Sequence, residues 1–196
     1  MDYQPIMNEV QIVENAVSPM FLEYVRYQVQ ESENWSWQYP KGAHFSKRQP
    51  KLTLNDGPQP PQVERLAGIA MSLFLNIYEK GLQGKVYPEL LWAGASIKDK
   101  HREDNTHTDH MDDVPKNMKV VKILGVLNSD WKQEWGGGFT WNGKTYYAKP
   151  GSFYFFDPRV PHRADDILCD EKRIAIDYTL RAITYHQQDK TTEVKM

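Results

Sequence analysis

Residues 173–180 read Arg-Ile-Ala-Ile-Asp-Tyr-Thr-Leu, and this run decides the fold class. Successive side chains of a β-strand point to opposite faces. One face of the run would therefore carry only large apolar side chains, namely Ile174, Ile176, Tyr178 and Leu180. The opposite face would carry Arg173, Ala175, Asp177 and Thr179. We therefore predict a strand whose two faces differ in chemistry.

Strand-like runs also fill the part of the chain that precedes this one. They are separated by turn signals such as Asn142-Gly143 and Pro150-Gly151. The runs are Val86–Ile97, Val120–Asn128, Phe139–Trp141, Thr145–Ala148 and Ser152–Phe156. Many short strands with tight turns, and no helical pattern between them, predict an antiparallel sandwich or barrel.

Helical patterns occur only before residue 85. One helix is expected from Ser18-Pro19 to about Gln30, and a longer one from Pro60-Pro61 to the glycines at 81 and 84. The stretch Tyr39–Gln62 between them is predicted to be a loop. We expect one mainly β domain over 1–196, with helical support and a loop in 1–84, the strand-rich core in 85–182 and a polar tail in 185–196.

Composition excludes several classes of protein. The 196 residues carry a formal net charge of −2, which gives no general attraction to nucleic acid or anionic lipid. The single cysteine excludes an intramolecular disulfide and a thiolate-rich metal site. No signal peptide is read at the N-terminus, and no run approaches the roughly 18 apolar residues of a membrane helix. A cytoplasmic location without membrane partners is expected.

Two overlapping His-x-Asp units lie between residues 105 and 113. On an extended segment, His107 and Asp109 would point to the same side and could bind adjacent positions of one metal. A second histidine, His162, would complete the two-histidine, one-carboxylate set that is typical of non-haem iron(II) oxygenases. The pair formed by His110 and Asp112 is an alternative register for the first two ligands.

Arg173 is the remaining candidate for chemistry. An arginine at the start of a largely apolar strand needs an anionic partner if it is buried. The carboxylate of a bound cosubstrate would serve as a bidentate partner. A purely structural alternative is an ion pair of Arg173 with Asp165, Asp166 or Asp177.

The ordered motifs resemble those of the 2-oxoglutarate/iron(II) oxygenases of the prolyl 4-hydroxylase-like branch. In order they are His107-Thr108-Asp109, Leu127-Asn128-Ser129-Asp130-Trp131, Trp135-Gly136-Gly137-Gly138, Pro150-Gly151, Pro161-His162-Arg163 and Arg173. The resemblance implies a double-stranded β-helix, a jelly-roll of the cupin-like kind. It implies that His107, Asp109 and His162 hold Fe(II), that Arg173 holds the cosubstrate 2-oxoglutarate, and that dioxygen is consumed, with ascorbate a further candidate cofactor.

The expected reaction is hydroxylation of an unactivated C–H bond. The resemblance places a prolyl or other side chain of a protein or peptide first among substrates. A free small molecule, such as an amino acid or sugar derivative, is the alternative. Oxidative demethylation of nucleic acid rests only on the basic residues Lys47, Arg48 and Lys51, and the net charge opposes it. A zinc hydrolase and a non-catalytic jelly-roll binding module are the competing classes, and the oligomeric state is not predicted.

Overall fold

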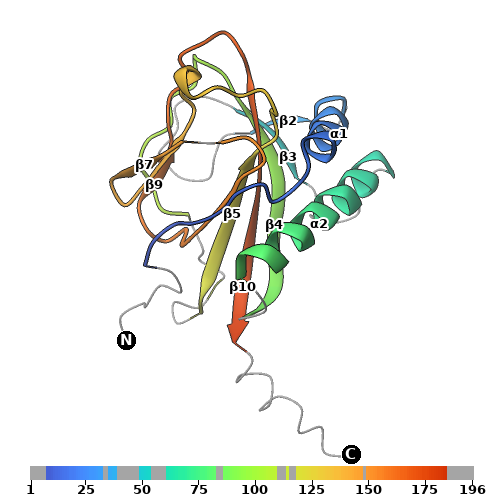
Figure 1. Ribbon diagram of the computed structural model, residues 1–196, viewed down its shortest axis with the longest axis vertical. Coiled ribbons are helices and arrows are strands. Elements are labelled where there is room, and N and C mark those ends of the chain that lie inside the picture. Colours follow the sequence, from blue (N-terminus) through green and yellow to red (C-terminus); the bar gives the residue numbers. More distant parts are fainter. Residues whose placement is uncertain are drawn as a thin grey trace, which may run out of the picture.

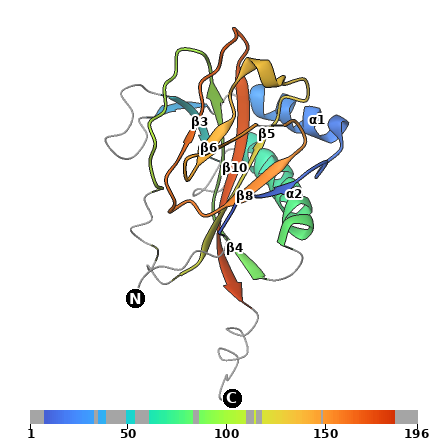
Figure 2. The ribbon, with the colours of Figure 1, turned by 60° about the vertical axis from the view of Figure 1, so that its left-hand side comes forward.

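The computed structural model shows a large β-sheet with helices on one side and a small β-sheet on the other (Figure 1). In the view turned by 60°, α1 and α2 lie to one side of the long strand β10, while β6 lies to its other side (Figure 2). The residues that the structure describes are 8–32, 35–38, 49–53, 61–82, 86–109, 114, 118–147 and 149–184.

The strands of these residues form two antiparallel sheets. The large sheet has the order β1 (Gln11–Val13), β8 (Phe153–Phe156), β5 (Val120–Val126), β10 (Arg173–Thr184), β4 (Val86–Lys98), β3 (Gln49–Thr53) and β2 (Ser36–Gln38). The small sheet has the order β7 (Lys144–Tyr146), β6 (Phe139–Trp141) and β9 (His162–Ala164), and a short 3-10 helix, η1, covers Gln133–Trp135. In the large sheet, β10 therefore lies between β5 and β4.

Two helices contribute to the core on the outer face of the large sheet. The helix α1 (Pro19–Gln30) begins at Ser18, whose hydroxyl accepts a hydrogen bond from the backbone N–H of Phe21 at 3.2 Å. The helix α2 (Pro61–Leu82) lies nearby, and Tyr178 of β10 donates to its Ala70 carbonyl at 2.8 Å. The buried side chains of this core include Leu22, Val25, Leu73, Phe74, Ile77, Ile123, Ile174 and Ile176.

A second apolar cluster lies between the two sheets. Tyr154 and Phe156 of β8 pack there with Phe139 and Trp141 of β6. Trp141 also donates its indole N–H to the Asp157 carbonyl at 3.0 Å. The alternate residues of β8, Phe153 and Phe155, belong to the helix-side core. The strand β8 is therefore buried on both faces, which explains its continuous apolar sequence.

The prediction of a mainly β chain with antiparallel strands is confirmed, and both helices occupy the residues at which the sequence places them. No pattern in the sequence predicts β1, β2, β3 or β9. The strand β3 (Gln49–Thr53) lies inside the stretch Tyr39–Gln62 that was predicted to be a loop. These strands have three to five residues and are held by backbone pairing with neighbouring strands, so they need no alternating pattern of their own.

Two other expectations are outside what this structure tests. The polar tail 185–196 lies beyond the described residues, and the division at residue 85 stays a prediction. No helix among the described residues combines the length and the apolar character that a membrane crossing needs.

Candidate metal centre and anion site

Two histidines from distant parts of the chain are paired through their backbones. The N–H of His107 donates to the carbonyl of His162 at 2.9 Å, and the N–H of His162 donates to the carbonyl of His107 at 2.8 Å. This antiparallel bridge extends the small sheet beyond β9. It brings the two imidazole rings to a centroid distance of 4.7 Å.

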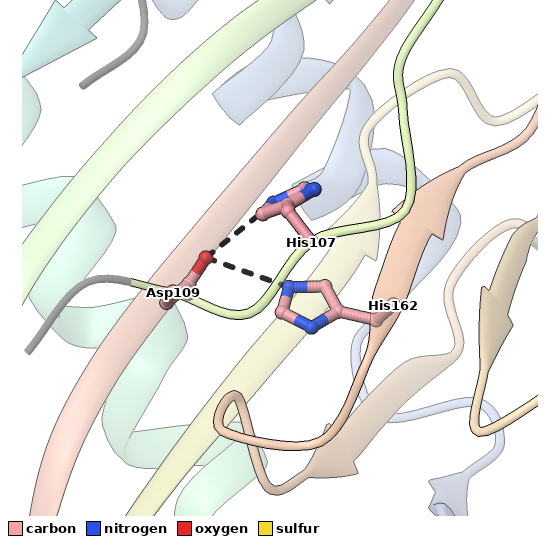
Figure 3. Close-up of side chains that lie close together, drawn as sticks. All are labelled: His107, Asp109 and His162. Atoms are coloured by element: carbon pink, nitrogen blue, oxygen red, sulfur yellow. Dashed lines mark ion pairs between the residues drawn. The ribbon is translucent and has the colours of Figure 1, made fainter. Parts of the chain in front are cut away.

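The carboxylate of Asp109 completes a compact cluster with these rings. The Asp109 backbone N–H donates to the Pro158 carbonyl at 2.9 Å, which fixes the segment next to the residues before β9. Its Oδ1 then lies 3.6 Å from Nε2 of His107 and 3.5 Å from Nε2 of His162 (Figure 3). One candidate ligand atom from each residue lies within 4.8 Å of the others. The three residues that the sequence singled out are therefore brought together.

Hydrogen bonds at Nδ1 orient both imidazole rings. Nδ1 of His107 lies 2.9 Å from the Asn105 carbonyl oxygen, and Nδ1 of His162 lies 2.8 Å from the Val160 carbonyl oxygen. A carbonyl oxygen can only accept, so each Nδ1 would carry the proton and each Nε2 would keep its lone pair. Partners of this kind are what metal-bound histidines use to fix their tautomer. The two Nε2 atoms therefore face Asp109 as acceptors that suit a cation.

Asp109 also contacts a lysine that is not among the residues singled out from the sequence. Lys122 of β5 places its Nζ 2.6 Å from Oδ2 of Asp109 and 3.1 Å from Oδ2 of Asp177 on β10. Burial by itself raises the pKa of Asp109, but the neighbouring Lys122 ammonium lowers it well below its ordinary value. Burial likewise lowers the pKa of Lys122, and the two carboxylates raise it above its ordinary value. Both groups are therefore charged at neutral pH.

Arg173 is buried at the start of β10, next to the glycine run before β6. Its Nη1 donates to the carbonyl oxygens of Gly137 and Gly138, the latter at 3.2 Å. Its Nε is buried, and none of the described residues offers it a hydrogen-bond partner. The side chain therefore keeps donor capacity that its protein neighbours do not use.

The three carboxylates that could have neutralised Arg173 all have other partners. Asp165 accepts from Arg163 at 3.1 Å, Asp166 lies 3.9 Å from Nζ of Lys98, and Asp177 pairs with Lys122. No carboxylate of the described residues forms an ion pair with Arg173. Arg173 therefore does not form the ion pair with Asp165, Asp166 or Asp177 that was the structural alternative to cosubstrate binding.

Further positive charge surrounds Arg173. Its register partner on β4 is Lys98, which is buried with Asp104 at 2.8 Å, and Arg102 binds the same carboxylate at 2.9 Å. Burial and the nearby Arg102 lower the pKa of Arg173 to about 10, against the opposing effect of the Asp104 and Asp165 carboxylates. The guanidinium is still protonated at neutral pH. The region is therefore suited to a bound anion.

The alternative register for the first two ligands cannot be compared with this arrangement, because His110 and Asp112 lie outside the described residues. The residues missed by sequence reasoning are Lys98 and Lys122. The sequence does carry a signal for Lys122. This lysine is the single charge within the apolar run 120–126, and it lies on the same side of the strand as residues 124 and 126.

Comparison with known proteins supports the architecture. No family model and no curated protein matches the sequence. Solved structures do match. The chain has the fold of the prolyl hydroxylases. A viral collagen prolyl hydroxylase from Paramecium Bursaria Chlorella virus-1, solved as a 2-oxoglutarate complex, is 11% identical with a TM-score of 0.60. The match covers 89% of this chain and 96% of that one.

Other solved structures with this fold include a second prolyl hydroxylase and an enzyme of another kind. A prolyl hydroxylase from Trichoplax adhaerens, bound to a peptide of hypoxia inducible factor, is 16% identical with a TM-score of 0.58, covering 95% of this chain and 89% of that one. The α-ketoglutarate-dependent carbocyclase SnoK of nogalamycin biosynthesis is 12% identical with a TM-score of 0.62, covering 88% and 79%. At these identities the likeness concerns the fold alone, and function must be argued from the site.

Proposed function

We propose that this protein is an iron(II)- and 2-oxoglutarate-dependent dioxygenase that hydroxylates an unactivated C–H bond. In this proposal the large and small sheets are the two sheets of a double-stranded β-helix, and 85–182 is the catalytic core. The observation that carries it is the convergence of His107, Asp109 and His162, with both Nε2 atoms facing one carboxylate oxygen.

The donor set fits a divalent metal. Ligand bonds of about 2.1 Å that meet at right angles place two donors about 3 Å apart. The separations of 3.5 and 3.6 Å need only a small side-chain movement to reach that value. Two imidazoles and one carboxylate on one side of a metal leave the opposite positions open, as non-haem iron(II) oxygenases require. His107 and Asp109 keep 18% and 20% of their side-chain surface exposed, so the site is accessible.

Arg173 fits the distal carboxylate of 2-oxoglutarate. A buried guanidinium without an ion pair is costly, and a carboxylate that binds its remaining donors would remove that cost. Glycine is needed at position 138, whose carbonyl accepts from Arg173, because a Cβ there would lie 2.3 Å from the Tyr146 carbonyl oxygen. Iron(II) with 2-oxoglutarate and dioxygen would supply the oxidant for hydroxylation and yield succinate and carbon dioxide.

The protein's own residues would bind and orient the reactants. Lys122 holds one oxygen of Asp109, and the carbonyls of Asn105 and Val160 hold the two imidazoles in place. Phe156 packs edge-on against His162 at a centroid distance of 5.3 Å, which limits access of water from the β8 side. Preorganisation of this kind lets the site bind the metal with only a small movement of its ligands.

A prolyl or other side chain of a protein or peptide is the proposed substrate. The fold shared with a peptide-bound prolyl hydroxylase supports this choice. A free small molecule is the second candidate, because the same fold occurs in the carbocyclase SnoK from nogalamycin biosynthesis. Both candidates need the same metal and cosubstrate, so the class can be tested before the substrate is known.

The test is a titration of 2-oxoglutarate into anaerobic, iron(II)-loaded protein, monitored by the visible metal-to-ligand charge-transfer band. We expect the band in the wild type, its loss in Asp109→Ala and a weakened titration in Arg173→Ala. Asp112→Ala is the matched control, because it removes a neighbouring carboxylate from the alternative register. Loss of the band in Asp112→Ala with retention in Asp109→Ala would instead place the ligands at His110 and Asp112.

A wild type that binds zinc but gives no band with iron(II) and 2-oxoglutarate would contradict the dioxygenase proposal. A zinc hydrolase or a binding module would then take its place. If the band is present, succinate release should be measured with prolyl peptides, free amino acids and sugar derivatives. Stimulation by a peptide, with a mass increase of one oxygen in that peptide, would support the first substrate class.

A further inference from the structure

Lys122 occupies a place that stability alone does not explain. It is the one charged residue of β5, and it lies on the inner face of the large sheet between two carboxylates. The side chains of Lys122, Asp109 and Asp177 are only 17%, 20% and 12% exposed. Replacing a buried ion pair by apolar residues of similar volume is often neutral or stabilising. Stability alone therefore gives no reason for a lysine at this position.

The two oxygens of Asp109 have different surroundings. Oδ1 faces Nε2 of both histidines, whereas Oδ2 lies 2.6 Å from Nζ of Lys122. A hydrogen bond to one oxygen fixes the rotation of the carboxylate, so that only the other oxygen is directed toward the two imidazoles. Asp177, at 3.1 Å from Nζ, holds the ammonium from the other side.

We infer that Lys122 is a positioning residue for the metal centre. By holding Oδ2 it presents Oδ1 of Asp109 as a single ligand atom, and Asp177 keeps Lys122 in that place. The inference rests on the proposed metal site but goes beyond it, because neither Lys122 nor Asp177 belongs to the ligand set. Outer partners of this kind commonly change metal affinity by about 10- to 100-fold when they are removed.

The test uses the full chain without cosubstrate and Co(II) as the probe metal. The dissociation constant and the visible ligand-field spectrum are measured for a charge-neutral double variant, Lys122→Met with Asp177→Asn. This change removes one positive and one negative charge, so the net charge near the metal is unchanged. We expect the dissociation constant to rise by about tenfold or more and the spectrum to change.

The matched control is Lys100→Met with Asp170→Asn. It makes the same two substitutions in an exposed ion pair, whose side chains are 44% and 88% exposed. We expect this control to bind Co(II) as the wild type does. If both double variants weaken binding equally, the effect is not specific to the positioning pair and the inference is wrong.

Single variants separate positioning from charge. Lys122→Met alone removes a positive charge close to the metal. If Lys122 acted only through charge, Co(II) would bind more tightly with an unchanged spectrum, and the inference would be overturned. Lys122→Arg keeps both the charge and a donor, so it should fold and stay within about threefold of the wild-type affinity, since it keeps the outer contact. The ligand-field spectrum of Lys122→Arg should shift, because a planar guanidinium would hold Oδ2 of Asp109 differently. An unshifted spectrum would contradict the inference. This test remains available if the double variant does not fold.

The outcome also separates this inference from the proposed function. A wild type that binds no Co(II), or binds it equally well after Asp109→Ala, would contradict the metal site itself. A wild type that binds through Asp109, together with a folded double variant of identical affinity and spectrum, would contradict only the role of Lys122.

Discussion

The two faces of the large sheet carry different kinds of residue on the same strands. On β10, Ile176 and Tyr178 point into the core beneath the helices, where both are fully buried. Their neighbours Asp177 and Thr179 are also buried, but Asp177 forms an ion pair with Lys122 on the inner face. Burial alone therefore does not distinguish the faces. The difference lies in whether the buried atoms need a hydrogen-bonding or oppositely charged partner.

This difference separates stability from chemistry within one strand. The outer face is stabilised by non-directional contacts that scale with apolar area. The inner face contains charged groups whose burial is costly unless each has a partner. Substitutions on the outer face should therefore lower stability and leave ligand binding unchanged. Substitutions of the charged residues on the inner face should weaken ligand binding and leave stability largely unchanged.

The largest effect is expected from Ile176→Ala on the outer face. Removal of this fully buried side chain leaves a cavity beneath the helices and should lower the free energy of unfolding by about 2–5 kcal/mol. Denaturant unfolding measures this change. Co(II) affinity, measured on the protein that stays folded, should equal that of the wild type. A large loss of metal affinity would show that the two faces are not independent.

Arg173→Met should have the opposite signature. We expect the affinity for 2-oxoglutarate, measured with the charge-transfer band, to fall by about 100-fold, because a charged hydrogen-bonding partner is lost. The free energy of unfolding should not fall and should rise by about 1 kcal/mol, because a buried guanidinium that forms no ion pair with any described residue is replaced by an apolar side chain. A clear loss of stability with unchanged cosubstrate binding would contradict the assigned role of Arg173.

A smaller effect is expected at Gly138, beside Arg173. A Cβ there would lie 2.3 Å from the Tyr146 carbonyl oxygen, so Gly138→Ala must move the small sheet and should cost about 1–3 kcal/mol. The control is Gly68→Ala in α2, where nothing lies within 4 Å of the added atom. That change should stabilise the protein by about 0.5–1 kcal/mol. Thermal unfolding of the two variants, with shifts of opposite sign, checks the prediction.

The smallest effect concerns Glu23, which ties α1 to the turn after β5. Its carboxylate accepts from the Ser129 backbone N–H at 3.0 Å and pairs with Arg26. Burial raises the pKa of Glu23, but the bonds from Ser129 and Arg26 lower it below its ordinary value. A carboxyl whose folded-state pKa is lowered stabilises the fold above its unfolded pKa, and loses that contribution as pH falls through the folded value.

Glu23→Gln should therefore lower the free energy of unfolding at pH 7 by only a few tenths of a kcal/mol, since the side chain is 36% exposed and screened by solvent. The difference from wild type should shrink as pH falls below about 4. Denaturant unfolding at the two pH values is the measurement. A difference that grows at low pH would have the wrong sign for this contact.

The sequence by itself determined the fold class and the candidate ligands. Alternation in the run 173–180 and the continuous apolar run of β8 are local patterns, because strand geometry repeats every two residues. The helix at Pro19–Gln30 was recognisable from its serine cap and its proline. His107, Asp109, His162 and Arg173 could be selected because their chemical types occur in a recognisable order.

Only the tertiary structure decided which groups meet. The pairing of His107 with His162 and the placement of Lys122 between Asp109 and Asp177 depend on strands that are distant in sequence. The same holds for Arg173, for which no carboxylate of the described part of the chain forms an ion pair. The short strands β1, β2, β3 and β9 also escaped prediction, because their stability comes from neighbours and not from their own residues. Local periodicity specifies which face a side chain occupies, whereas register and sheet packing specify what lies opposite it.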